Sequence, residues 1–228
     1  MKDPIFNKTI KDPLLKACIK GDAAELQRLL EQGLKPVDFI PLAIDGIRKP
    51  PVLEVLLKHG LDPNAHFNEY QESLLSRAVT ESLEPSFHLL VKSGARIDVR
   101  NGWGMTLLHD AARTGRGDIA EFLIENGGDV NARSEQRHTP LILAAQGNQV
   151  GMMEILVAHG ADIEAQDIRS ITALILAAKA GKFEATQWLV QHGANLNTKD
   201  DSGKTALDWA EANNRTKIVE LLKSTRPF

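Results

Sequence analysis

The sequence repeats itself with a period of about 33 residues, and this period constrains the fold more than any other feature. The glycines that end apolar runs are spaced by 27, 34, 33, 33 and 33 residues, at Gly33, Gly60, Gly94, Gly127, Gly160 and Gly193. The leucines that open apolar runs are spaced by 28 and then five times by 33, at Leu14, Leu42, Leu75, Leu108, Leu141, Leu174 and Leu207. Two independent markers with one period predict a stack of similar units, each burying its apolar face on the next.

Each unit has room for two short helices joined by a tight turn. In the clearest unit, Leu108, Ala111 and Ala112 fall on one helical face. Thr106 is the predicted N-cap of that helix, and Gly127 is expected to end the second helix with a positive φ angle. The N-cap place is taken in other units by Ser73, Thr139, Thr172 and Thr205. The polar stretch after each glycine, rich in Asn, Asp and Gly, predicts a β-turn or short hairpin.

The repeated motifs resemble the ankyrin repeat. They are Thr139-Pro140-Leu141, Thr106-x-Leu108-His109-x-Ala111-Ala112 and Leu156-x-x-x-Gly160-Ala161-Asp162. The resemblance implies an all-α fold, a solenoid of helix-turn-helix pairs with β-hairpin or loop fingers. We expect a single ankyrin-repeat domain over residues 1–228, with the first and last units as caps. Its predicted units are about 8–38, 39–67, 68–100, 101–133, 134–166, 167–199 and 200–228.

Composition limits the classes of function. Hydrophobic residues make up 43% of the chain, which rules out wholesale disorder, and no apolar run is long enough to span a bilayer. The net charge is −3, and no segment has the basic excess that binding to a phosphate backbone usually requires. The lone Cys18 excludes an intrachain disulfide and a cysteine-based zinc site, and we expect it to be a buried, inert thiol.

No motif for catalysis, cofactor binding or metal binding emerges. There is no His-Glu-x-x-His, no complete phosphate-binding loop and no dinucleotide fingerprint. Three histidines precede helix-ending glycines and are interpreted as helix-end residues: His59, His159 and His192. The family resemblance implies that His109 forms a structural hydrogen bond with the threonine of its turn. For His66, His88 and His138, nothing in the sequence pairs them with a carboxylate at ligand or triad spacing, so we predict no catalytic, cofactor or metal residues.

Trp103 stands out among the few aromatic residues. Register places Trp209 in the core of the last unit and Trp188 on a second helix, partly buried between neighbouring helices. Trp103 instead lies in the predicted finger tip Asn101-Gly102-Trp103-Gly104, away from both helical faces. A core or neutral surface position for Trp103 remains the alternative.

The resemblance also implies where partners bind. Ankyrin proteins usually bind other proteins through a concave surface made by the fingers and the inner helices. The predicted protein-binding residues on that surface are Tyr70, Trp103, Met105, Arg113, Arg137, His138, Ile168, Arg169 and Lys179. Aromatic and arginine side chains on an exposed surface have the composition of binding hot spots. We therefore expect a folded partner with an acidic and partly apolar patch; a solvated mixed surface is the alternative.

The predicted function is a non-catalytic module that inhibits, or protects against, a partner enzyme by covering it. A scaffold that bridges two proteins is the alternative, and an enzyme or a nucleic-acid binder are the hypotheses from other classes. We expect a monomer when free, no cofactor, and neither nucleic acid nor membrane as partner. Met1-Lys2-Asp3-Pro4 leads into no apolar segment. The protein would be cytoplasmic if Met1 is its native start, and periplasmic or secreted if a signal peptide was removed.

Overall fold

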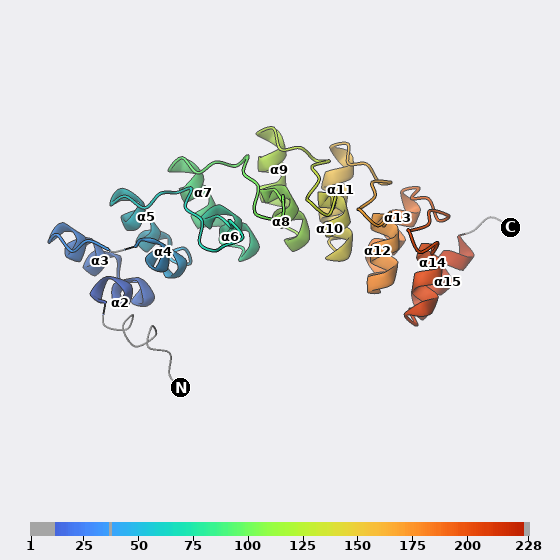
Figure 1. Cartoon of the computed structure of the whole chain (residues 1–228), viewed down its shortest axis with the longest axis horizontal. Helices are drawn as coiled ribbons and strands as arrows, with labels where there is room; N and C mark the ends of the chain where they lie inside the picture. Colours follow the sequence, from blue (N-terminus) through green and yellow to red (C-terminus); the bar gives the residue numbers. More distant parts are fainter. Residues whose placement is uncertain (1–11, 37, 226–228) are drawn as a thin grey trace. The chain divides into compact units, whose positions relative to one another are not determined.

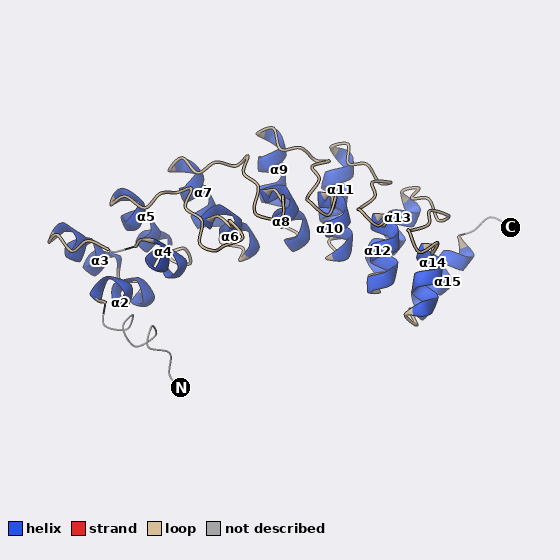
Figure 2. Ribbon diagram, viewed as in Figure 1, coloured by secondary structure: helices blue, strands red, loops and turns tan. Residues whose placement is uncertain are grey.

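The structure, a computed structural model, describes residues 12–36 and 38–225, and helices dominate it (Figure 1). The described residues contain fourteen α-helices and no β-strand (Figure 2). Two isolated β-bridges, between His66 and Ser73 and between Arg100 and Thr106, are the strand-like pairs found there. The predicted all-α class is confirmed, and the fingers are turns rather than extended hairpins.

The described helices form seven pairs, and each pair falls within one predicted unit. The pairs are α2 (Pro13–Lys20) with α3 (Ala23–Glu31), α4 (Ile40–Gly46) with α5 (Pro50–Lys58), α6 (Leu74–Thr80) with α7 (Glu84–Lys92), α8 (Leu107–Thr114) with α9 (Gly117–Glu125), α10 (Pro140–Gln146) with α11 (Val150–Ala158), α12 (Ala173–Ala180) with α13 (Phe183–Gln191), and α14 (Ala206–Ala212) with α15 (Thr216–Ser224). The two helices of every pair pack on each other. Residues 8–11 of the first predicted unit and 226–228 of the last lie outside the described residues.

Contacts divide the chain into two compact units, Met1–Ile97 and Asp98–Phe228. In the first unit, α2 packs on α4, and the second helices α3, α5 and α7 pack in series. In the second unit, the inner helices α8, α10, α12 and α14 pack in series, and so do α9, α11, α13 and α15. Within each unit the predicted stacking is present. The continuity of one domain across residue 97 stays a prediction.

Leucine and alanine build the core of the second unit. Leu108, Leu141 and Leu174 are buried at equivalent places on α8, α10 and α12. Small alanine side chains on the inner helices allow these helices to pack closely. The buried alanines are Ala111, Ala112, Ala144, Ala145, Ala177, Ala178 and Ala210. The 33-residue period therefore reflects close packing of one helix pair on the next.

The predicted helix caps are present. The Ser73 hydroxyl accepts the N–H of Ser76 at 3.1 Å, and Thr139 accepts the N–H of Ile142 at 3.3 Å. Thr172 and Thr205 cap α12 and α14 in the same way. Gly127, after the end of α9, has φ of 89°, a conformation that glycine adopts without the steric cost of a side chain. Local sequence thus sets where each helix begins and ends.

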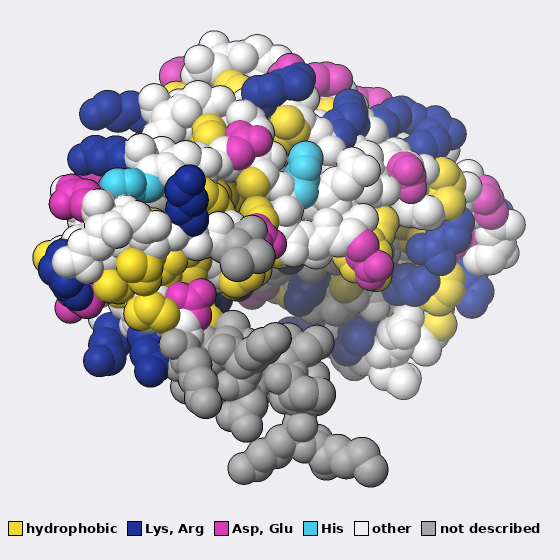
Figure 3. Space-filling view, turned by 60° about the vertical axis from the view of Figure 1, so that its left-hand side comes forward, with side chains coloured by type: hydrophobic (Ala, Val, Ile, Leu, Met, Phe, Trp, Pro, Cys, Tyr) yellow, Lys and Arg dark blue, Asp and Glu magenta, His cyan; other side chains and the backbone are white. Residues whose placement is uncertain are grey.

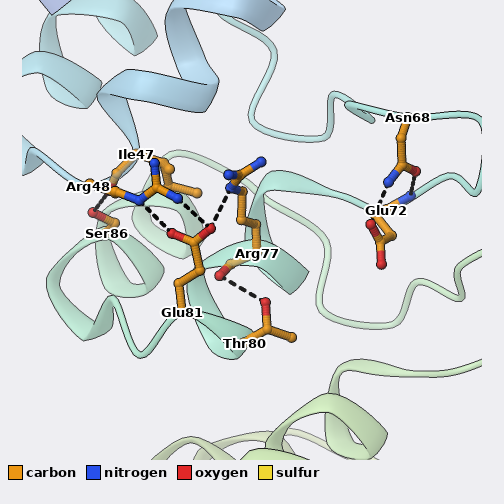
Figure 4. Close-up of polar contacts among 8 residues, drawn as sticks. All are labelled: Ile47, Arg48, Asn68, Glu72, Arg77, Thr80, Glu81 and Ser86. Atoms are coloured by element: carbon orange, nitrogen blue, oxygen red, sulfur yellow. Dashed lines mark hydrogen bonds and ion pairs between the residues drawn. The ribbon is translucent and has the colours of Figure 1, made fainter. Parts of the chain in front are cut away.

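A shared carboxylate joins the helix pairs of the first unit (Figure 4). Glu81 accepts from Arg48 at 2.8 Å and lies 2.9 Å from Nε of Arg77, so one side chain at the end of α6 bridges two arginines. The Ser86 hydroxyl on α7 donates to the carbonyl of Ile47, just after α4. These contacts connect α4 with α6 and α7 where the small contact area of short helices gives limited apolar burial.

Cys18 on α2 is buried, as predicted. Burial is the largest cause that raises the pKa of its thiol to about 11. A thiol with that pKa stays protonated at neutral pH and is a poor nucleophile.

Replacement of Leu141 by alanine tests the register of the stack. Leu141 is 1% exposed in α10, so the truncation leaves a cavity between inner helices. We expect Leu141→Ala to lower the free energy of unfolding by about 2–5 kcal/mol in urea titrations followed by circular dichroism. The control Glu154→Ala, at an exposed position of α11, should change it by less than about 0.5 kcal/mol. An unchanged midpoint for Leu141→Ala would contradict this packing.

Candidate functional site: the finger row

The candidate site is a row of four fingers in the second unit, residues 101–104, 134–137, 167–170 and 200–203, here called the finger row. Each finger is closed by the side chain of its first residue. The Asn101 Oδ1 accepts the backbone N–H groups of Trp103 at 3.0 Å and Met105 at 3.1 Å. Asp167 Oδ1 likewise accepts the backbone N–H groups of Arg169 at 2.7 Å and Ile171 at 2.9 Å. The turn therefore satisfies its own donors without a strand.

Equivalent side chains close the other fingers. Asp200 Oδ1 accepts two backbone N–H groups at 2.9 and 3.0 Å, and the Ser134 hydroxyl accepts the N–H of His138 at 3.1 Å. In the first unit, Asn68 accepts from Tyr70 and Glu72 (Figure 4). The role of these residues was not predicted, although they recur every 33 residues, at Asn68, Asn101, Ser134, Asp167 and Asp200. A polar column at that period is the signal that could have found them.

Backbone hydrogen bonds connect the fingers of the row. Glu135 N–H donates to the Trp103 carbonyl at 2.9 Å, Ile168 N–H to Gln136 at 3.1 Å, and Asp201 N–H to Arg169 at 3.1 Å. Each bond runs from one finger to the next, so all four fingers are joined in series. The finger row is consequently a connected surface with a fixed backbone.

Several predicted binding residues project from this backbone. Trp103 is 38% exposed and Ile168 is 47% exposed, which is unusual for large apolar side chains. Arg137 and Arg169 are exposed in the same row, and Met105 is half-buried beneath the first finger. Tyr70 is 46% exposed on a finger of the first unit. Its place on one surface with Trp103 stays a prediction, because the two residues belong to different units.

Two predicted cations lie at the ends of inner helices. Arg113, near the end of α8, is exposed and approaches Asp110 at 3.7 Å. Lys179, near the end of α12, has its Nζ 3.9 Å from the centroid of the Trp209 ring. Lys179 is therefore engaged with an aromatic ring of the last repeat, which the sequence did not indicate.

His138 has a carboxylate neighbour, so the expectation that it lacks one is wrong. Its Nε2 lies 3.6 Å from Oδ2 of the buried Asp167. The partner is the first residue of the next finger, 29 positions away, and spacing along the chain could not show this proximity. His88 similarly lies 3.9 Å from Glu84. Both are pairs of one histidine and one carboxylate.

Trp209 also departs from prediction, since it is half-buried rather than in the core. Its indole N–H donates to Oδ2 of Asp200 at 2.7 Å, and Lys204 Nζ lies 4.3 Å from the ring centroid. Trp188, in contrast, is buried and stacks on the ring of His192. The hydrogen bond to Asp200 in the last finger holds Trp209 at the surface, and the repeat register alone could not predict this bond.

His109 bonds to Thr106 of its own turn, as the resemblance implied, and it also reaches the residue after the next finger. Its Nδ1 accepts the Thr106 N–H at 3.1 Å and lies 2.8 Å from the Thr106 hydroxyl oxygen. Its Nε2 lies 2.9 Å from the carbonyl oxygen of His138, which can only accept, so Nε2 carries the proton. Burial, which outweighs the backbone hydrogen bond, lowers the pKa of His109 to about 4. In the last repeat Asp208 replaces this histidine, and its Oδ2 accepts the Thr205 N–H at 2.8 Å.

The surface carries mixed charge. On the face drawn in Figure 3, Lys and Arg side chains lie among acidic and apolar ones and form no continuous basic stripe over the described residues. Residues 12–36 and 38–225 contain no group of three or more His, Cys, Asp or Glu side chains that could hold a metal ion. Among the helices described, none is long and apolar enough to cross a membrane.

Comparison with known proteins agrees with this architecture. A family model described as ankyrin repeats in three copies matches residues 75–167 and 166–226. The chain belongs to the ankyrin repeat family. The human protein named cyclin-dependent kinase inhibitor 2A is 30% identical over 117 residues, which cover 49% of this chain and 75% of that protein. Bovine cyclin-dependent kinase 4 inhibitor B is 29% identical over 115 residues, covering 48% and 88%. The repeat architecture and these relatives support a protein-binding module.

The buried histidine makes stability depend on pH. Because the pKa of His109 is lower in the folded than in the unfolded protein, its contribution is complete above about pH 6.5 and is lost as pH falls toward 4. Between pH 7.5 and 5.5 this group should remove about 1 kcal/mol of unfolding free energy. Urea titrations should show that His109→Gln lacks this part of the pH dependence, whereas His159→Gln, at an exposed position, retains it. Equal slopes for both variants would refute the assignment.

Two glycines provide a matched test of finger packing. Gly104 and Gly203 have φ angles of 69° and 77° at equivalent places, so alanine strains the backbone similarly at both. A Cβ at Gly104 would lie 3.1 Å from the backbone N of Glu135, whereas one at Gly203 meets nothing within 4 Å. Gly104→Ala should therefore cost about 1 kcal/mol more than Gly203→Ala in urea unfolding. Equal costs would contradict the contact between these fingers.

Proposed function

We propose that this ankyrin protein inhibits a partner enzyme, a protein kinase, by covering its surface with the finger row and the adjacent inner helices. The observation that carries the proposal is Trp103, exposed at a tip whose backbone is fixed on both sides. Asn101 accepts its N–H, and its carbonyl accepts from Glu135 of the next finger. A large side chain on a backbone that is already fixed requires little backbone ordering on binding, which favours its use as a binding hot spot.

The enzyme class comes from the relatives. The human and bovine proteins described above carry names of inhibitors of cyclin-dependent kinases, and each aligns over three quarters or more of its own length. A row of hydrogen-bonded fingers can cover a folded surface without rearranging. Covering one surface requires one partner, and we therefore favour inhibition over bridging.

A substitution of Trp103 tests this function. Purified wild-type protein is assayed against a panel of protein kinases with peptide substrates, and the inhibition constant is measured for the kinase that responds. We expect a 1:1 complex, and an inhibition constant about 30-fold higher for Trp103→Ala, corresponding to ~2 kcal/mol. Adding Arg169→Glu should weaken inhibition further if that arginine faces an acidic patch.

The control is Glu154→Ala on α11, which should leave inhibition unchanged. Full inhibition by the Trp103→Ala, Arg169→Glu double variant would overturn the placement of the surface. A complex that leaves kinase activity intact and binds a second protein at the same time would identify an adaptor instead.

A further inference from the structure

A groove at the last two fingers of the second unit is the strongest unassigned feature. Its volume is about 410 Å³, and its lining includes Arg169, Ile171, Lys179, Asp200, Lys204 and Trp209. The side chains come from two fingers and from the inner helices α12 and α14. Ile171 is buried and forms an apolar floor. Volumes of about 300–1,000 Å³ are typical of sites that bind small groups.

Three cations converge on this groove without acidic partners. Lys179 and Lys204 place their Nζ atoms 3.9 and 4.3 Å from the Trp209 ring centroid, and Arg169 lines the same space. Among the residues that the structure describes, none of the three forms an ion pair with a carboxylate. The electron-rich ring face stabilises an ammonium group only partly, and the two ammonium groups lie within one screening length of each other. With three cations against the two lining carboxylates, Asp200 and Asp201, the groove has a net charge of +1.

The aspartates of the groove already have other hydrogen-bond partners. Asp200 accepts two backbone N–H groups, the Ser202 hydroxyl and the Trp209 indole. Burial acts to raise the pKa of Asp200, but these hydrogen bonds prevail and lower it. Asp201 accepts the Ser170 hydroxyl. Both carboxylates therefore hold the finger in place, and the cations remain available to an incoming anion.

We propose that this groove binds a carboxylate side chain on an acidic segment of the folded partner. The inference rests on the proposed function, because it assigns a subsite to the same finger row. Arginine and lysine form strong, charge-assisted hydrogen bonds with carboxylates. The Trp209 ring and Ile171 offer apolar contact to the methylene groups of a glutamate.

Charge favours an acidic protein segment over nucleic acid. A phosphate backbone binds along many basic residues in succession, whereas this chain has net charge −3 and the cations gather at one groove. A single carboxylate, by contrast, needs only the two or three donors present here.

Nuclear magnetic resonance of the tryptophan indole N–H groups tests the proposal on the full ¹⁵N-labelled chain. The chain has three tryptophans, and Trp209→Phe assigns the signal of interest. Decaglutamate is titrated at low salt, with decaglutamine as the neutral control and oligothymidylate as the phosphate control. We expect a saturable shift of the Trp209 signal with decaglutamate alone. The signal of the buried Trp188 should stay in place.

Charge-removing variants locate the response. Arg169→Gln and Lys204→Gln should each weaken the apparent affinity for decaglutamate about three- to tenfold. Lys217→Gln removes the same charge from an exposed position on α15 and should have no effect. No shift at millimolar peptide, an equal shift with decaglutamine, an equal loss in Lys217→Gln, or tighter binding of oligothymidylate would each overturn the proposal.

The outcome separates this inference from the proposed function. If Trp103→Ala relieves kinase inhibition while decaglutamate does not shift the Trp209 signal, the inhibitory function is supported and the carboxylate subsite is refuted. If decaglutamate binds as expected and no kinase is inhibited, the carboxylate subsite is supported and the proposal that the partner is a kinase is refuted.

Discussion

The fingers depend on one side-chain oxygen that accepts two backbone N–H groups of its own turn. Asn101, Asp167 and Asp200 each form this arrangement in the second unit. Because the turn donors are satisfied internally, the finger needs no partner strand. Backbone bonds between successive fingers then convert separate turns into one surface. The display of Trp103 follows from these local bonds rather than from a sheet.

The helices could be predicted because their determinants are local. Thr139 caps α10, Gly127 ends the preceding pair, and Leu141 recurs at the packing period, so each signal lies within a few residues of its effect. The candidate site was only partly predictable. The side chain of His138 lies close to Asp167, and that of Lys179 lies close to Trp209. The two residues of each pair belong to adjacent repeats and are about thirty positions apart in the sequence. Such pairs depend on how far individual side chains extend from one repeat to the next, and the repeat period of the sequence does not predict this.

Repetition also allows different chemistry to fill one structural role. His109 and Asp208 occupy equivalent positions and each accepts the N–H of the capping threonine of its own helix. The histidine is buried and reaches the next finger, whereas the aspartate is exposed at the end of the array, where no further finger is described. The repeats between them carry Ile142 and Ile175 at this position, so a polar group there is not required in every repeat.

The fourth position of each finger has a positive φ angle, and this has a consequence for how the surface can diversify. Glycine fills the position at 104 and 203, but Arg137 and Ser170 adopt it with φ of 57° each. A side chain there adds a group to the finger row and costs about 1–2 kcal/mol of backbone energy. New specificity at these tips is therefore coupled to stability. A protein that acquires side chains at several of these positions must first have surplus stability in its helical core. Returning one position to glycine would recover the stability lost there.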